Sequence, residues 1–219
     1  MISIPKPAST VILMDQQNNV YLTKRPVTMK FLGGFFVFPG GSVDEKDSLY
    51  NDKYFINCPK DSCFDFSYYI AAARELFEEV GVLLVEDEQI PADAKWHYRK
   101  QLIKGDITFL HFLESENVQL DLGKLHYFGH RITPETQKYR YDTRFFIAKM
   151  PPGQTPQPEE TEIDEAYWAS PTEALTAFDK GEIALAPPTK ASLKTIANYL
   201  VGSGPLVLPE RKNESELRN

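Results

Sequence analysis

The sequence predicts an α+β protein built on a mixed β-sheet, and the order of its segments supports this. β-prone segments come first, a segment of helical periodicity follows, and strands and helices return after it. The length of 219 residues allows one good-sized core and is short for two ordinary domains. We therefore assign residues 1–209 to a single domain and the polar residues 210–219 to a flexible C-terminal tail.

The first elements are predicted to be strands. Residues 9–24 contain two β-prone runs around a turn cluster at 15–19, which is the pattern of a hairpin. Residues 35–38 form a third run, which stops just before two glycines. We expect Gly40 and Gly41 to form a tight loop, because glycine tolerates positive φ angles and lets other groups approach the backbone closely.

The strongest helical signal begins at residue 67, after a polar stretch without a clear period. Apolar residues then recur at the spacing of one helix face until Gly81, and glycine is the residue type expected just after a helix ends. The residues of this apolar face are Tyr69, Ile70, Ala73, Leu76, Phe77 and Val80.

The second half of the chain contains a further insertion and the remaining elements. Residues 90–124 look mostly helical and are too long for a simple hairpin, so we predict a helical insertion there. His126 and His130 lie four residues apart in a strand-like segment, which would place them on the same side of a strand. The other predicted elements are strands at 125–132 and 143–149, a proline-rich loop at 151–158, and helices at 171–180 and 189–200.

Composition excludes several classes of protein. A net charge of −7 argues against a sequence-independent nucleic-acid binder, which would carry a basic face. No apolar run approaches the roughly 18 residues that a membrane helix needs. Cys58 and Cys63 have neither the number nor the spacing of a disulfide framework or a zinc site. The N-terminal residues do not resemble a signal peptide, so we expect a cytoplasmic protein without nucleic-acid or membrane partners.

Three glutamates on the predicted helix are the first candidate site. At about 100° per residue, Glu75, Glu78 and Glu79 share one part of the helix circumference, nearly opposite the apolar face. Carboxylates this close repel one another, so a cation should compensate their charge. Oxygen ligands suit hard ions, which favours Mg²⁺ or Mn²⁺. A solvated acidic surface is the alternative that the glutamates alone would favour.

The residues around these glutamates resemble a known motif. Phe-Pro-Gly-Gly at 38–41 and Arg-Glu-Leu-x-Glu-Glu-x-Gly-Val at 74–82 resemble the Nudix box of the Nudix hydrolases, and the second half matches at every specified position. Asp47 stands where the family has glutamate, and 26 residues separate it from Arg74 where the family has seven. An insertion at about 48–66 accounts for the difference.

The position of this insertion and several downstream segments resemble one branch of the family. The branch is that of the peroxisomal coenzyme A diphosphatases and their bacterial relatives. This resemblance implies a Nudix fold, in which a mixed sheet is sandwiched between helices. The matching segments are 38–47, 74–84, 131–134, 141–148 and 187–189.

The resemblance implies roles for the residues of the box. Glu75, Glu78 and Glu79 would bind Mg²⁺ or Mn²⁺ and thereby take part in catalysis, with the Gly41 carbonyl as an additional candidate ligand. The other motif residues would be structural: Arg74 would pair with an acidic residue, for which Asp47 is the candidate, and Gly40 and Gly81 would shape the backbone.

Residues outside the box are candidates for the remaining roles. Glu162 is expected to be the general base, with Glu159 and Glu160 as rivals in the same acidic stretch. Arg140 and Arg144 are candidates for contacts with substrate phosphates, because a guanidinium can bind two oxygens at once. Arg25 is a third candidate. A surface or ion-pair role is the alternative for each arginine.

The implied function is metal-dependent hydrolysis of a diphosphate in a small nucleoside diphosphate derivative, with coenzyme A or acyl-CoA favoured. ADP-ribose, NADH and dinucleoside polyphosphates stay open as substrates. A non-catalytic domain that senses a nucleotide is the second hypothesis, although such a module would not need three mutually repelling glutamates. The resemblance also implies that a homodimer can form.

Overall fold

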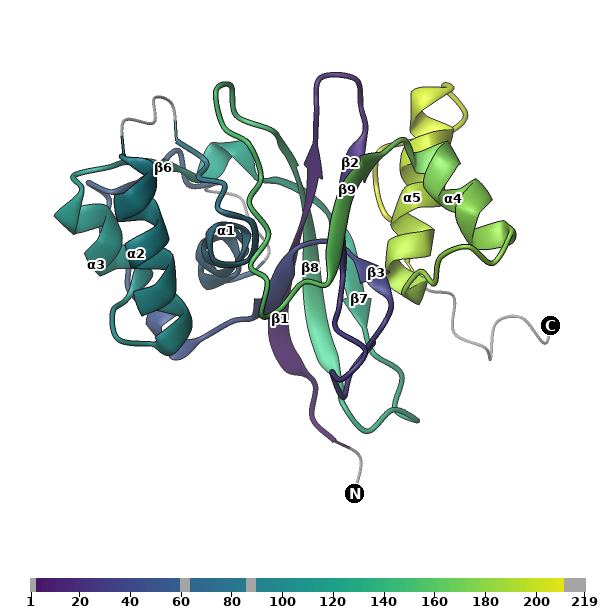
Figure 1. Cartoon of the computed structure of the whole chain (residues 1–219), viewed down its shortest axis with the longest axis horizontal. Coiled ribbons are helices and arrows are strands. Elements are labelled where there is room, and N and C mark those ends of the chain that lie inside the picture. Colours follow the sequence, from purple (N-terminus) through teal and green to yellow (C-terminus); the bar gives the residue numbers. More distant parts are fainter. Residues whose placement is uncertain (1–2, 60–63, 86–89, 211–219) are drawn as a thin grey trace.

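The described residues, 3–59, 64–85 and 90–210 of a computed structural model, form three layers (Figure 1). Two separate apolar clusters lie on the two faces of a central sheet. The predicted α+β fold, a mixed sheet between helices, is confirmed. One face carries α1 (Ser67–Val80), α2 (Ala92–Lys104) and α3 (Phe109–Ser115), and the other carries α4 (Pro171–Asp179) and α5 (Pro187–Leu200).

The strands of the main sheet are β1 (Lys6–Met14), β2 (Val20–Lys24), β3 (Phe36–Val37), β4 (Gly40–Ser42), β7 (His126–Ile132), β8 (Tyr141–Lys149) and β9 (Glu165–Ala169). Their order is β3-β2-β1-β8-β7, with β4 paired to β1 and β9 paired to β2. The central pair, β1 and β8, is parallel and runs from Lys6↔Tyr141 to Met14↔Lys149. The other pairings between these strands are antiparallel, so the sheet is mixed.

Two short strands differ from the sequence-based expectation. The glycine pair does not form a tight loop: Gly40 and Gly41 lie in β4 and pair with Thr10 and Ser9 of β1. The expected close approach is present, because a Cβ at Gly40 would lie 2.7 Å from the Thr10 Cα. β9, which follows the acidic stretch, was not predicted. It extends the sheet beyond β2 and thereby ties the end of that stretch to the N-terminal hairpin.

The prediction that His126 and His130 share one side of their strand is wrong. The register of β7 against β8 shifts between Tyr127 and Gly129, which is a β-bulge. His126 therefore pairs with Ile147 and His130 pairs with Arg144, three residues apart on β8. Because successive residues of β8 face opposite sides of the sheet, the two histidines do so as well.

The two insertions pack together beside α1. Strand β5 (Phe55–Ile56), from the first insertion, pairs in parallel with β6 (Leu120–Asp121), from the second. In the second insertion, α2 and α3 are followed by β6 and by a 3-10 turn, η2 (Leu122–Lys124). The first begins beside another 3-10 turn, η1 (Glu45–Ser48). Together they enclose the side of α1 that faces away from the sheet.

The box helix α1 is built as its sequence predicts. Its apolar residues are buried, and Gly81 ends it in the left-handed conformation at φ 71°, with its N–H bonded to the Phe77 carbonyl. Burial of this face fixes the opposite face, which carries the glutamates, toward β4 and η1.

The C-terminal part of the described chain covers the edge strand β7. Leu208 is buried, and its N–H bonds to the Phe128 carbonyl at 2.7 Å. Among the described residues, no helix has the length and apolar character to cross a membrane. Most of the predicted C-terminal tail, residues 211–219, lies outside the described residues.

Candidate active site

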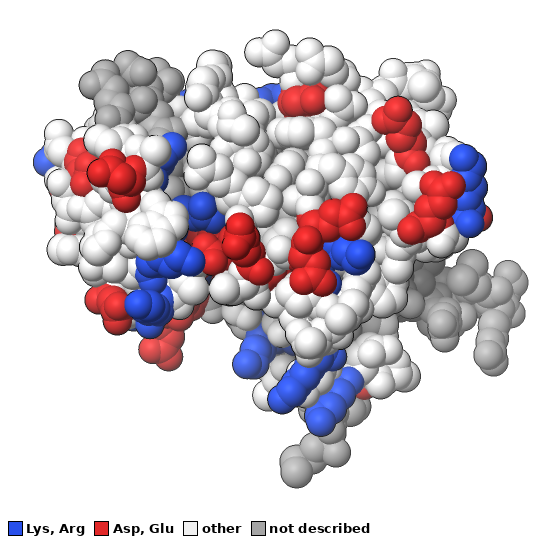
Figure 2. Space-filling view, in the orientation of Figure 1, with Lys and Arg blue, Asp and Glu red and all other residues white. Residues whose placement is uncertain are grey.

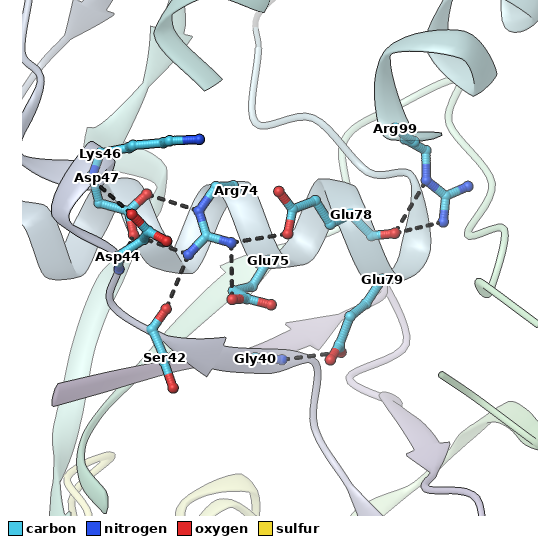
Figure 3. A network of polar contacts seen from close by, with 10 residues as sticks. All are labelled: Gly40, Ser42, Asp44, Lys46, Asp47, Arg74, Glu75, Glu78, Glu79 and Arg99. Carbon is cyan, nitrogen blue, oxygen red and sulfur yellow. Dashed lines mark hydrogen bonds and ion pairs between the residues drawn. The ribbon is translucent and has the colours of Figure 1, made fainter. Parts of the chain in front are cut away.

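Arg74 is the centre of the polar network on α1 (Figure 3). Its Nε and Nη2 donate to the two carboxylate oxygens of Asp47 at 2.8 and 2.9 Å, and Nη2 also donates to the Ser42 carbonyl at 3.0 Å. Asp47 is buried in η1 and is held there by the Asp44 N–H. The first insertion thus leaves Arg74 and Asp47 paired, as the resemblance implies, although it separates them widely in sequence.

The other nitrogen of the same guanidinium contacts two of the box glutamates. Arg74 Nη1 donates to Glu75 Oε1 and to Glu78 Oε2, both at 2.9 Å. Glu79 turns instead toward β4, where its carboxylate accepts from the Gly40 N–H at 3.1 Å. The side chains of Glu75 and Glu78 are only 14% and 12% exposed, and Glu79 is buried. These carboxylates are therefore not the solvated surface that their number alone would favour.

The charge of this group is poorly compensated. Burial raises the pKa of Glu75 to about 7, in spite of the Arg74 guanidinium beside it. Burial also raises the pKa of Glu79 well above its usual value, with Glu75 and Glu162 adding to the effect. The pKa of Glu78 is raised for the same first reason. Buried carboxylates in this state favour either a proton or a cation.

The loop that follows the proline-rich segment is bonded to the last turn of α1. The Glu159 N–H donates to the Glu79 carbonyl at 2.7 Å, and the Gln157 N–H donates to the Val80 carbonyl at 2.8 Å. The N–H groups of Glu162 and Ile163 then return to the Glu159 carbonyl at 3.0 Å. These bonds satisfy carbonyls that a helix end leaves unpaired, and they place Glu162 beside the box carboxylates.

A pocket of about 740 Å³ opens next to the network. Its polar end is lined by Glu75, Glu79 and Glu162 and by the glycines of β4. Glu78 does not line it in this conformation. The sheet, the segment between β2 and β3, the segment between β7 and β8, and the start of α5 form the other walls. These walls include Met29, Phe31, Leu32, Ile132, Pro134, Tyr141, Pro187 and Pro188.

The acidic stretch offers three glutamates, and their surroundings differ. Glu162 lines the pocket and acts electrostatically on all three box glutamates. Glu159 is buried and accepts from Lys100 Nζ at 2.9 Å, and these contacts lower its pKa in spite of burial. Glu160 is exposed. The geometry therefore favours Glu162 over both of its rivals.

Of the three candidate arginines, only Arg25 lines the pocket. Arg140 is buried and donates to the carbonyls of Thr133 and Ser3 at 3.0 and 2.6 Å. Arg144 pairs with Asp142 on the opposite face of the sheet, where its guanidinium lies over the Phe64 and Tyr68 rings. Both residues fix the β7–β8 region, and their expected contact with substrate phosphates does not fit these positions.

The donor set suits a hard divalent cation. It consists of carboxylates and a carbonyl, and a Cβ at Gly41 would lie within 2.5 Å of Glu75 Cδ, so only glycine admits the carboxylate this close to the backbone. Within residues 3–59, 64–85 and 90–210, no three His, Cys, Asp or Glu side chains already converge as a metal cage. Glu75 and Glu78 are oriented toward Arg74, and Glu79 toward Gly40. Binding of a cation would therefore include rotation of these side chains.

Comparison with known proteins agrees with this site. The family model that matches is that of the NUDT19 Nudix domain, over residues 51–196, more than half of the chain. The chain belongs to the Nudix hydrolases. The resemblance of the 74–82 motif to a Nudix box is thereby confirmed, as is the branch of the family.

This Nudix hydrolase is similar to curated proteins and to a solved structure. It is 28% identical over 183 residues to "Putative nudix hydrolase 7" of Caenorhabditis elegans, which covers 83% of this chain and 56% of that one. It is 29% identical to the human "Acyl-coenzyme A diphosphatase NUDT19" over 62% of this chain and 40% of that one. The chain thus spans about half the length of these relatives.

The structure of a NUDIX hydrolase from Alicyclobacillus acidocaldarius has 28% identity to this Nudix hydrolase and a TM-score of 0.79. The match covers 96% of this chain and all of that one. The MutT protein of Methanosarcina mazei Go1, at 12% identity and a TM-score of 0.51, shares the fold alone. The large insertions therefore occur within an otherwise ordinary Nudix fold.

Two arginines of this Nudix hydrolase were not singled out from the sequence. Arg131 lines the pocket and donates to the His130 carbonyl at 2.8 Å. Arg99 of α2 contacts the box helix itself, through the Glu78 carbonyl. Figure 2 shows several basic side chains below the central acidic groups on the displayed face, and others beside acidic groups elsewhere on that face. Cationic groups of this kind suit an anionic substrate.

Proposed function

We propose that this Nudix hydrolase cleaves the diphosphate of a small nucleoside diphosphate derivative with Mg²⁺ or Mn²⁺ held by Glu75, Glu78 and Glu79. The Gly41 carbonyl is an additional ligand. The observation that carries the proposal is the burial of Glu75 and Glu79 at one end of the pocket, with Glu78 beside Glu75 on the shared Arg74 guanidinium; burial raises the pKa of Glu75 to about 7. A divalent cation would remove the repulsion and attract phosphate oxygens at the same point.

The chain's own residues supply the other steps. When bound, the metal neutralises phosphate charge and helps orient the attacking water. Glu162 accepts a proton from that water while the oxygen of the water forms a bond to phosphorus. The bond from phosphorus to the bridging oxygen breaks, and the bridging oxygen leaves with the second phosphate, so that two phosphomonoesters result. Arg25, on the pocket wall, binds substrate phosphate oxygens.

Coenzyme A or acyl-CoA is the favoured substrate within this class. The support is the name of the similar human protein together with the pocket, whose apolar walls could contact a long, uncharged moiety. The substrate is tested with a panel of coenzyme A, an acyl-CoA, ADP-ribose, NADH and a dinucleoside polyphosphate, each with Mg²⁺ and with Mn²⁺. Product masses identify the bond that is cleaved. Fastest turnover of ADP-ribose, NADH or a dinucleoside polyphosphate would contradict the preference.

The same panel separates catalysis from nucleotide sensing. If one compound binds tightly and none is hydrolysed, the protein is a sensor and the catalytic proposal fails.

Glu78→Gln should abolish turnover and leave the fold unchanged, as judged by circular dichroism. Because outer-shell changes alone typically weaken metal binding about 10- to 100-fold, this variant should bind Mn²⁺ at least about tenfold more weakly. Retained turnover would remove the metal assignment. That the protein forms a homodimer stays a prediction, which gel filtration with light scattering can test.

A further inference from the structure

Arg99 is the most buried basic side chain outside the Nudix box among the described residues, at 5% exposure, and it comes from the helical insertion. Its Nη2 donates to two carbonyls at once, those of Glu78 and Gln157, both at 2.9 Å. Its Nε donates to the Glu78 carbonyl as well, at 3.3 Å. One guanidinium therefore joins the box helix to the loop that leads to Glu162.

The contact completes the C-terminal end of α1. The last four carbonyls of a helix have no partner within the helix. Here Gly81 donates to the first of them, that of Phe77, and the loop amides of Glu159 and Gln157 donate to those of Glu79 and Val80. The remaining one, the Glu78 carbonyl, accepts only from Arg99 among the described residues. The helix end is thus shared between the loop and the insertion.

The next residue of α2 reinforces the same junction. Lys100 Nζ pairs with Glu159 Oε1 at 2.9 Å, and Glu159 also accepts from Thr161. Glu159 is three residues before Glu162, whose N–H bonds to the Glu159 carbonyl. Two consecutive residues of the insertion therefore hold Gln157 and Glu159, the two loop residues whose amides bond to α1.

We propose that Arg99 is a positioning residue, which holds the loop of Glu162 in register with the carboxylates of α1. The inference rests on the proposed function for its catalytic consequence, and its structural part stands on the contacts alone. Arginine is suited to this role because its planar guanidinium presents several donors in fixed directions, whereas lysine offers a single centre. The helical insertion then contributes to the geometry of the site as well as to the apolar core.

The structural part is tested by amide hydrogen exchange in Arg99→Lys. This variant keeps the charge but cannot bond both carbonyls in the same way. Exchange in residues 151–164 should accelerate by about tenfold or more, because the loop would separate from α1 more often and open the bonds of the Gln157 and Glu159 amides to the Val80 and Glu79 carbonyls, while exchange in α5 stays unchanged. Lys104→Gln is the matched control, because Lys104 is exposed at the end of α2 and should leave this loop unaffected.

The catalytic part is tested by a double-mutant cycle with Glu162→Gln. A displacement of about 1 Å can reduce a rate about 10²-fold, so Arg99→Lys should lower kcat by about 10- to 10²-fold, with KM and Mn²⁺ affinity within about twofold. If Arg99 acts through Glu162, the double variant should be no slower than Glu162→Gln alone. Independent effects would multiply, and this would overturn the proposal.

The two proposals fail in different ways. Unchanged exchange in residues 151–164 of folded Arg99→Lys, or wild-type kcat despite faster exchange, would overturn the role of Arg99. Full activity of Glu162→Gln would instead remove the general base from the proposed function. If Arg99→Lys does not fold, Lys100→Gln replaces it, since this variant breaks the partly exposed pair with Glu159 and should raise exchange in the same residues. Wild-type exchange in that variant would then count against the proposal.

Discussion

Arg74 and Asp47, 27 positions apart in the sequence, form a buried, bidentate ion pair. Asp47 is 1% exposed and Arg74 is 12% exposed. Burial by itself would lower the pKa of Arg74, but its hydrogen bonds with Asp47 and the charges of Glu75, Asp47 and Glu78 raise it instead. The pair fixes Arg74 between η1 and α1, and so determines where its remaining nitrogen meets the glutamates.

Asp47→Asn should destabilise the fold. Removing one partner of a buried ion pair typically costs about 3–5 kcal/mol in the free energy of unfolding; because Arg74 keeps its contacts with Glu75 and Glu78, the loss here should lie at the lower end of this range. Urea denaturation measures the change, and Asp52→Asn, at an exposed aspartate nearby, serves as the control. A loss below about 1 kcal/mol for Asp47→Asn would mean that the pair adds little to stability.

The three glutamates of the acidic stretch should respond differently to replacement by glutamine. Glu162→Gln should lower kcat by about 10²- to 10⁴-fold, the usual effect of losing a general base. Glu159→Gln should give a smaller loss, because its side chain is engaged with Lys100, and Glu160→Gln should match the wild type. Steady-state kinetics at saturating Mg²⁺ compares them. Three equally mild effects would place the base in another segment.

The metal-free protein should lose stability as pH rises through the neutral range. The pKa of Glu75 is about 7 in the folded state, against an ordinary value of 4.5. Between these values the folded chain binds more protons than the unfolded chain, so stability falls with increasing pH. Thermal denaturation in EDTA between pH 4 and 8 measures this, and Glu75→Gln should flatten the dependence. If the thermal midpoint of the wild type rose with pH while that of Glu75→Gln did not, the predicted direction of the pH dependence would be wrong.

Metal binding should show the opposite pH dependence. A carboxyl group must lose its proton before it can ligate a cation, so Mg²⁺ affinity should increase as pH passes about 7. Stabilisation by Mg²⁺ should grow over the same range. Calorimetric titration at pH 6 and pH 8 gives the affinities and the number of protons released. Equal affinities at the two pH values would exclude Glu75 as a ligand.

An added methyl group should affect the two glycines of β4 differently: at Gly40 it should lower stability, and at Gly41 it should lower turnover. Gly40→Ala places Cβ 2.7 Å from the Thr10 Cα at a φ of 154°, so backbone must move, and unfolding should become easier by about 1–3 kcal/mol. Gly41→Ala meets mainly the end of the Glu75 side chain, so the fold should survive while turnover falls. Urea denaturation and kinetics of both variants check this. Equal stability losses would contradict the distinction.

The sequence predicted what depends on local pattern or on the motif. The periodicity of residues 67–80 gave α1 and its buried face, since a helix is defined by contacts a few residues apart. The Nudix box gave the glutamates and the partner of Arg74. Strand β9 was missed because it follows an acidic loop and is largely half-exposed, so its apolar pattern is weak.

Properties that depend on strand register were not predictable. A single bulge in β7 turns His130 to the side opposite His126. Gly129 is a residue type that often marks a bulge within a strand, but it does not by itself determine where the register shifts. Arginine is a residue type that often contacts phosphates. However, side chains alternate between the two faces of β8, and Arg144 therefore lies on the face away from the pocket, over Phe64 and Tyr68. Arg99 left no signal at all, because its acceptors are main-chain carbonyls, which every residue has.

The parallel pairing of β1 with β8 also joins the two ends of a long segment of chain, which affects the rate of folding. Two segments that meet along nine residue pairs are separated by more than a hundred residues, and loop closure of that size slows folding. Gly41 pairs with β1 and α1 packs on β1, whereas Glu162, at the same end of the pocket, follows β8 in the chain, so this end of the pocket is complete only after residues beyond β8 have been synthesised. On a growing chain, the glutamates of α1 therefore emerge well before the residue that completes their site.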